Sequence, residues 1–122
     1  MRALLSIRPE HARSILAGTK RFEYRRVPFA QPVETVVLYA SSPLRLVVGE
    51  FRVRRLHQST PARLWRATHE HAGISRTHFY EYFRACDSAF AIEIAEARAY
   101  EKPFPLHRIY GSTPPQSFAY LD

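Results

Sequence analysis

The stretch Gly18-Thr19-Lys20-Arg21-Phe22-Glu23-Tyr24-Arg25-Arg26 decides how the rest of the chain is expected to be organised. An apolar pattern with helical spacing covers residues 9–17, and Gly18 is the natural residue to end that helix in a left-handed conformation. The residues that follow alternate as a strand, which places two aromatic rings on one face and Glu23 and Arg25 on the other. Because the stretch sets opposed charges beside apolar surface, we expect it to line a ligand-facing cleft.

Further strands and helices are expected on both sides of this stretch. Segments rich in β-forming residues predict five more strands. They cover residues 2–7, 33–39, 46–56, 88–97 and part of 114–121. Pro103 and Pro105 are expected to break regular structure after the strand at 88–97. Thr60 and Ser75 are capping residues that predict two helices, the first ending at Gly73, and Gly49 predicts a bulge or barrel corner. The order favours an α+β fold with a small curled sheet, in a single domain over residues 1–122.

The composition is that of an ordinary globular chain. Its 122 residues are 46% hydrophobic and 24% charged, enough to bury a core without disulfides or metal. Cys86 is the only cysteine, so no disulfide can form within the chain. The apolar run after Met1 is too short for a signal peptide, and no window has the length of a membrane span. We expect a cytoplasmic protein with no membrane partner, and a monomer as the default.

Positive charge is concentrated in the first half of the chain. The net charge is +7; residues 1–60 carry 11 basic and 4 acidic side chains, whereas residues 61–122 carry 7 of each. A one-sided basic surface attracts polyanions, with nucleic acid as the first candidate. An arginine-rich composition can also produce such a charge without a polyanionic partner. Only Lys20 and Lys102 among the 18 basic residues are lysines, which hints at a need for a compact point charge at Lys20.

The spacing Gly18-x-Lys20-x-x-Glu23-x-Arg25, after a short helix and at the start of a strand, resembles the signature of ASCH domains in the PUA-like superfamily. The resemblance extends to residues 6–10, 38–43, 47–51 and 114–118, and it is strongest to stand-alone bacterial and archaeal members. It implies a PUA-like β-barrel of about five to six mixed strands with flanking helices, and a cleft between the first helix and the barrel. It also implies binding of RNA, or of DNA in some members; other members resemble amidohydrolases acting on acylated cytidine, or ribonucleases.

The candidate ligand-binding residues fall into a specific set and a general basic set. Lys20 and Arg25 would contact phosphate or a base carbonyl, and Glu23 would accept hydrogen bonds from the amino edge of a base. The same three charges could instead form a partly buried network that holds the helix against the barrel. Arginines would contact the nucleic-acid backbone, and residues beside the matched motifs would border the cleft. These further candidates are Arg8, Arg21, Arg26, Tyr24, Tyr39, Ser41, Arg52 and Arg54.

A non-enzymatic binding domain is the leading interpretation, with no catalytic residue, cofactor or metal assigned. In the amidohydrolase branch a threonine stands where this chain has Glu23, and a lysine paired with a carboxylate stays protonated. His69 and His71 point in different directions on a helix, and His78 and His107 lack neighbours at metal-ligand spacing, so the six histidines are expected on the surface. A metal-independent ribonuclease using histidine or lysine stays open, as does a module whose basic face binds a protein.

Overall fold

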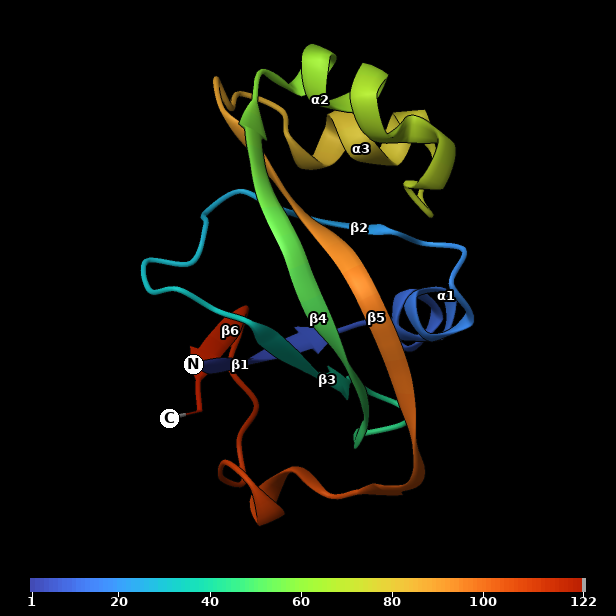
Figure 1. Ribbon diagram of the computed structural model, residues 1–122, viewed down its shortest axis with the longest axis vertical. Helices are drawn as coiled ribbons and strands as arrows, with labels where there is room; N and C mark the ends of the chain where they lie inside the picture. The colour runs from blue at the N-terminus through green and yellow to red at the C-terminus, as the bar shows by residue number, and fades with distance from the viewer. Residues whose placement is uncertain (122) are drawn as a thin grey trace.

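The computed structural model describes residues 1–121 as one curled sheet of six strands with three α-helices (Figure 1). The strands are β1 (Arg2–Ile7), β2 (Phe22–Arg25), β3 (Thr35–Ala40), β4 (Leu46–Ser59), β5 (Ala89–Phe104) and β6 (Phe118–Tyr120). The helices are α1 (Pro9–Ala17), α2 (Pro61–Thr68) and α3 (Arg76–Tyr82), with 3-10 turns η1 (His69–His71) and η2 (Leu106–Arg108). The predicted α+β class, the order of elements and the curled mixed sheet are confirmed.

The sheet curls far enough for its two edges to approach each other. Its order is β2-β5-β4-β3-β1-β6, with β1 parallel to β3 and every other pair antiparallel. Side chains bridge the edges: the Arg25 guanidinium donates to the Ser117 hydroxyl, and the rings of Phe29 and Phe118 pack edge to face at 4.8 Å. A half-barrel therefore closes through side-chain contacts between β2 and the segment around β6.

The long β4–β5 ribbon carries the helical pair α2 and α3 at one end of the half-barrel (Figure 1). Thr60 accepts a hydrogen bond from the Arg63 amide, and Ser75 accepts one from the His78 amide, so both predicted helix caps are confirmed. Helix α2 nevertheless ends at Thr68, and the 3-10 turn η1 follows it. Within residues 1–121, no helix has the length and apolar character that a membrane crossing needs.

The predicted end of β5 at residue 97 is wrong, because the strand continues to Phe104. The register between β4 and β5 shifts where Val47 pairs with Phe104 and Gly49 with Ala99. Pro103 lies in this irregular segment. A proline in a strand is tolerated at a bulge because it has no ladder hydrogen bond to donate there.

Gly49 marks the bulge that the sequence predicts. Its position is fully enclosed: a methyl group added there would lie 2.6 Å from the Arg98 carbonyl oxygen and 2.8 Å from Leu16 Cδ2. Gly49 therefore allows the β4–β5 ribbon to pass close beneath α1.

Gly49→Ala is expected to lower the free energy of unfolding by about 3 kcal/mol, because the new methyl group meets backbone that cannot move away cheaply. Urea unfolding followed by circular dichroism would measure the change. Gly111→Ala is the matched control, since nothing lies within 4 Å of a methyl group at that position. Equal stability of the two variants would contradict the close packing described for Gly49.

Candidate functional site

Lys20 enters the protein interior because of the way α1 ends. Gly18 has φ +87, and its amide donates to the Ile15 carbonyl. The Thr19 and Lys20 amides both donate to the Ser14 carbonyl, so the chain reverses tightly at the end of the helix. The Lys20 side chain consequently points under the helix and is only 1% exposed.

The segment after η1 holds the buried Lys20 from the opposite side. Lys20 Nζ donates a 2.6 Å hydrogen bond to the Ala72 carbonyl and lies 5.0 Å from the centre of the Tyr24 ring. A methyl group at Gly73 would lie 2.6 Å from Lys20 Cβ and Cγ, so the aliphatic stem packs directly against this glycine. Burial lowers the pKa of Lys20, and the nearby Glu23 carboxylate opposes that shift.

Glu23 lies between two cations, with its carboxylate nearly buried. One carboxylate oxygen is 3.9 Å from Lys20 Nζ, and the other accepts a 3.2 Å hydrogen bond from Arg25 Nη1. Arg25 in turn donates to Ser117 near β6. The ion pair with Arg25 is therefore the closer one, and Lys20 depends on the Ala72 carbonyl for its short hydrogen bond.

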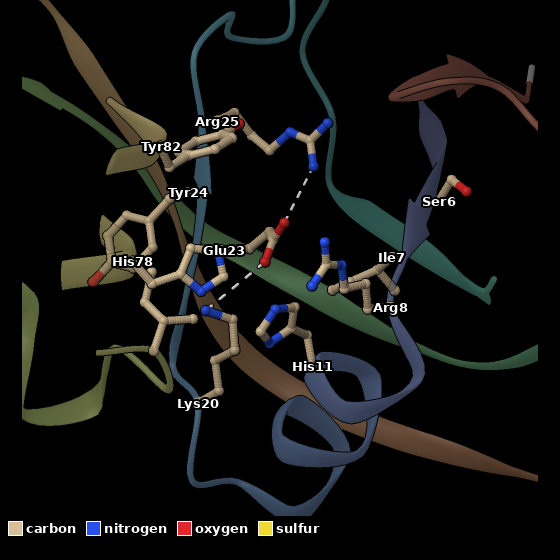
Figure 2. A pocket seen from close by; sticks show the side chains of 11 residues that line it. Ser6, Ile7, Arg8, His11, Lys20, Glu23, Tyr24, Arg25, His78 and Tyr82 are labelled. Carbon is tan, nitrogen blue, oxygen red and sulfur yellow. Dashed lines mark hydrogen bonds and ion pairs between the residues drawn. The ribbon is translucent and has the colours of Figure 1, made fainter. Parts of the chain in front are cut away.

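A cavity of about 230 Å³ opens above these charges (Figure 2). Its wall is formed by β1 and α1 on one side and by β2 and α3 on the other. The lining residues are Ser6, Ile7, Arg8, His11, Lys20, Glu23, Tyr24, Arg25, Ile74, His78 and Tyr82. We call this cavity the main pocket. It combines three cations, one carboxylate and two imidazoles with apolar walls, and so can hold a small polar or anionic ligand.

Two histidines face each other across the main pocket, and sequence reasoning missed both. The rings of His11 on α1 and His78 on α3 are 6.1 Å apart (Figure 2). Burial and the positive charge of Lys20 lower the pKa of His11, which favours its neutral form. The surface location expected for His11 is wrong, because the docking of α1 on the sheet half-buries it. His78 and Tyr82 are four residues apart on α3, a spacing that would have marked them as neighbours.

Five predicted site residues line the main pocket: Arg8, Lys20, Glu23, Tyr24 and Arg25. Tyr24 is only 5% exposed, and its hydroxyl is hydrogen-bonded to Thr68 at 2.7 Å. Lys20 lies over its ring, and Phe79 packs against it edge to face at 5.0 Å. Tyr24 is therefore part of the wall, and its packing does not support a role as a stacking platform.

Two other predicted candidates lie outside the main pocket. Tyr39 is 5% exposed and packs in a core cluster with Leu4, Val47 and Leu106, so its burial does not support contact with a ligand. Strand β3 is covered on both faces, which turns this side chain inward. Ser41 follows β3, and its amide donates to the Ile7 carbonyl.

The remaining predicted arginines lie on other surfaces. Arg21 and Arg54 line a separate hollow between α1 and the β4–β5 ribbon, and Glu93 forms an ion pair with Arg54 there. Arg26 packs over the Tyr82 ring and donates to the Tyr82 carbonyl, and Arg52 is exposed on β4. The structure thus brings the specific set, Lys20, Glu23 and Arg25, together in the main pocket, whereas these other arginines are dispersed over the surface.

A curled mixed sheet with a helical end and a charged pocket beside the first helix defines the PUA-like class of domains. The family model of the ASCH domain matches residues 5–104. The chain therefore belongs to the ASCH domain family. The resemblance drawn from the Gly18-x-Lys20-x-x-Glu23-x-Arg25 spacing is confirmed.

Solved and curated relatives extend this assignment. The crystal structure of ASCH from Zymomonas mobilis matches with a TM-score of 0.91 and 26% identity, covering 99% of this chain and 87% of that one. An ASCH domain-containing ribonuclease from the same species is 27% identical, over 98% of this chain and 83% of the relative. A Ureaplasma parvum protein named ATP synthase subunit alpha is 29% identical over 97% of this chain, which spans only 15% of that protein's length.

Metal ligation finds no support among the side chains described. Within residues 1–121, no three histidine, cysteine, aspartate or glutamate side chains are grouped as metal ligands would be. The side chains that line the main pocket can form hydrogen bonds and ion pairs and can transfer protons.

Proposed function

We propose that this protein binds RNA without altering it and holds one nucleotide in the main pocket. The observation that carries the proposal is the buried Lys20, whose pKa is lowered by burial while it faces a cavity. Burying a lysine whose pKa is lowered costs stability, and groups with perturbed pKa values in clefts are candidates for functional sites. A phosphate or a base carbonyl in the pocket would supply Lys20 with a second close acceptor besides the Ala72 carbonyl, because Glu23 lies 3.9 Å away.

The size of the main pocket favours a single nucleotide over a larger ligand. Pockets for drug-sized molecules span about 300–1,000 Å³, and this cavity holds about 230 Å³. A base can enter such a cavity only when it is turned out of a stack. Single-stranded RNA presents bases in this way, and hydrogen-bonding side chains then read their edges. Glu23 would accept from an amino group while Arg25 and Arg8 donate.

One curated relative supports proposing RNA before DNA. The Zymomonas relative that covers nearly the whole chain is named a ribonuclease, so its substrate class is RNA. Exposed arginines outside the main pocket, Arg52 and Arg54 among them, would contact phosphates without reading sequence. Binding should therefore weaken steeply as salt concentration rises.

Fluorescence anisotropy with single-stranded RNA, single-stranded DNA and duplex RNA would test this proposal. Single-stranded RNA is expected to bind most tightly, with affinity falling as salt increases. The double variant Arg52→Gln/Arg54→Gln should reduce the salt slope by about two, since each phosphate contact contributes about one unit. Absence of binding to any of these nucleic acids at low salt would overturn the proposal.

Cleavage of RNA is the second candidate, and the facing imidazoles of His11 and His78 favour it. Attack of a 2′-hydroxyl oxygen on the adjacent phosphorus forms a 2′,3′-cyclic phosphate and releases the 5′-oxygen. This reaction needs a base for the hydroxyl proton and an acid for the leaving oxygen. The neutral form favoured at His11 suits the base, and His78, whose ring centre is 6.1 Å away, or Lys20 would act as the acid.

Product analysis separates cleavage from binding. A cleaving protein would yield cyclic-phosphate ends, would leave a 2′-deoxy site intact, and would lose activity in His11→Gln and His78→Gln but not in His107→Gln, whose histidine lies outside the main pocket. RNA that stays intact while bound would reject this candidate and retain the first.

A further inference from the structure

A second hollow lies between helices α2 and α3, and neither the family signature nor the proposed function uses it. It is an open depression of about 410 Å³ and shares no lining residue with the main pocket. Its residues are Ala62, Trp65, Arg66, His69, Arg76 and Tyr80. We call this the helical hollow. Three of its six side chains are aromatic rings, two are arginines, and none is acidic.

The aromatic rings are anchored at the core and open toward the helical hollow. Trp65 packs against the buried Phe79 at 4.9 Å, and Tyr80 meets Phe79 edge to face at 5.2 Å. Trp65 and Tyr80 are 6.5 Å apart and inclined at 59°, so they diverge and do not stack on each other. Both side chains are only half-buried. The His69 ring also lies 5.8 Å from the Trp65 ring. Aromatic rings that border an open hollow are the usual platform for an unpaired base.

The two arginines supply positive charge at the rim. Arg76 lies 5.6 Å from the centre of the Tyr80 ring, and both Arg66 and Arg76 are exposed. Within residues 1–121 neither arginine forms an ion pair with a carboxylate. The cations of the helical hollow are therefore available to an anionic ligand.

Helix α3 joins the helical hollow to the main pocket. His78 and Tyr82 line the main pocket, whereas Arg76 and Tyr80 line the helical hollow. Residues two apart on a helix point to nearly opposite sides, because each residue turns the helix by about 100°. An RNA strand with one nucleotide in the main pocket would have to cross only the width of α3. A neighbouring base could then enter the helical hollow.

We infer that the helical hollow is a second RNA-binding site, which stacks an unpaired base on Trp65 or Tyr80 while Arg66 and Arg76 contact the flanking phosphates. This inference rests on the proposed function, because the ligand is the same single-stranded RNA. It adds a base-stacking site, on the outer side of α3, to the nucleotide held beside Lys20. Two sites on one strand also make binding depend on RNA length.

The chain carries a built-in probe, because Trp65 is its only tryptophan. Adenylate oligomers of increasing length, titrated at low salt, should quench Trp65 fluorescence at the same concentrations that raise anisotropy. Trp65→Leu should weaken oligomer binding about 10-fold because a stacked base is lost. Separately, Arg66→Gln/Arg76→Gln should weaken it about 10-fold because two phosphate contacts are lost. Affinity for adenosine monophosphate should change less than about 2-fold in these variants, because the main pocket holds a single nucleotide.

Arg63→Gln/Arg84→Gln is the matched control, since it removes the same charge from exposed positions near α2 and α3 outside the helical hollow. Circular dichroism unfolding would establish that all variants fold. The inference is overturned if oligomers bind but leave Trp65 fluorescence unchanged, or if the Arg66/Arg76 variant binds as well as the control. Those results would leave the proposed function standing. Absence of any RNA binding would overturn both.

Discussion

Glu23→Ala is expected to lower the free energy of unfolding by about 3–5 kcal/mol, the usual result of removing one partner from a buried ion pair. The Glu23 carboxylate is the only one within 4 Å of either Lys20 or Arg25 among the residues described. Lys20 is only 1% exposed, whereas Arg25 keeps its hydrogen bond to Ser117. Urea unfolding would measure the loss, most of which we assign to the uncompensated charge on Lys20.

The loss caused by Glu23→Ala should shrink as the pH rises. The pKa of Lys20 is already below its ordinary value of 10.5, and Glu23 is the group that opposes this shift. Without Glu23 the folded-state pKa falls further. Between that value and 10.5 the unfolded chain binds more protons than the folded one, so stability increases with pH. A mutational loss that does not vary from neutral pH toward 10.5 would contradict the assignment to Lys20.

Glu10→Ala is the matched control for Glu23→Ala. Glu10 lies at the start of α1, 4.0 Å from Arg8, with both side chains largely exposed. An exposed pair of this kind contributes little, and its removal should change stability by less than about 1 kcal/mol at every pH.

Lys20→Met is expected to weaken nucleotide binding strongly while leaving the protein at least as stable as before. Methionine matches the shape of the buried stem, and Glu23 keeps its closer partner Arg25 at 3.2 Å. Removing a buried charge whose pKa is lowered favours stability, which offsets the lost hydrogen bond to the Ala72 carbonyl, about 1 kcal/mol. Affinity for a mononucleotide should fall about 10- to 100-fold, because a charge-assisted hydrogen bond contributes about 1.5–3 kcal/mol.

Lys102→Met is the natural control, since Lys102 is the chain's only other lysine and is exposed near the far end of β5. Anisotropy and urea unfolding on both variants would separate the two effects. Unchanged affinity in Lys20→Met would show that the main pocket is not the binding site. A large loss of stability in the same variant would instead favour the reading of Lys20 as part of a structural charge network.

Local patterns in the sequence predicted the elements that short-range physics controls. The caps at Thr60 and Ser75, the end of α1 at Gly18 and the bulge at Gly49 depend on neighbouring backbone groups or on the absence of a side chain. Strand β5 was placed correctly but ended too early, because the bulge that accommodates Pro103 arises from pairing with β4. That pairing joins residues about fifty positions apart, which no local pattern reports.

The same distinction between local and long-range effects applies to the candidate site. The sequence by itself determined that Lys20, Glu23 and Arg25 belong together, because a three-residue spacing and strand alternation bring them close wherever the strand lies. Only the tertiary structure decided how deeply each of these side chains is buried and which distant groups it contacts. The burial of Lys20 depends on the segment around Ala72, 52 residues away, and the approach of His11 and His78 depends on how α1 and α3 are positioned by the sheet. Burial and long-range contact set pKa values and open a cavity, and these come from packing between distant segments, which the order of residues along the chain does not display.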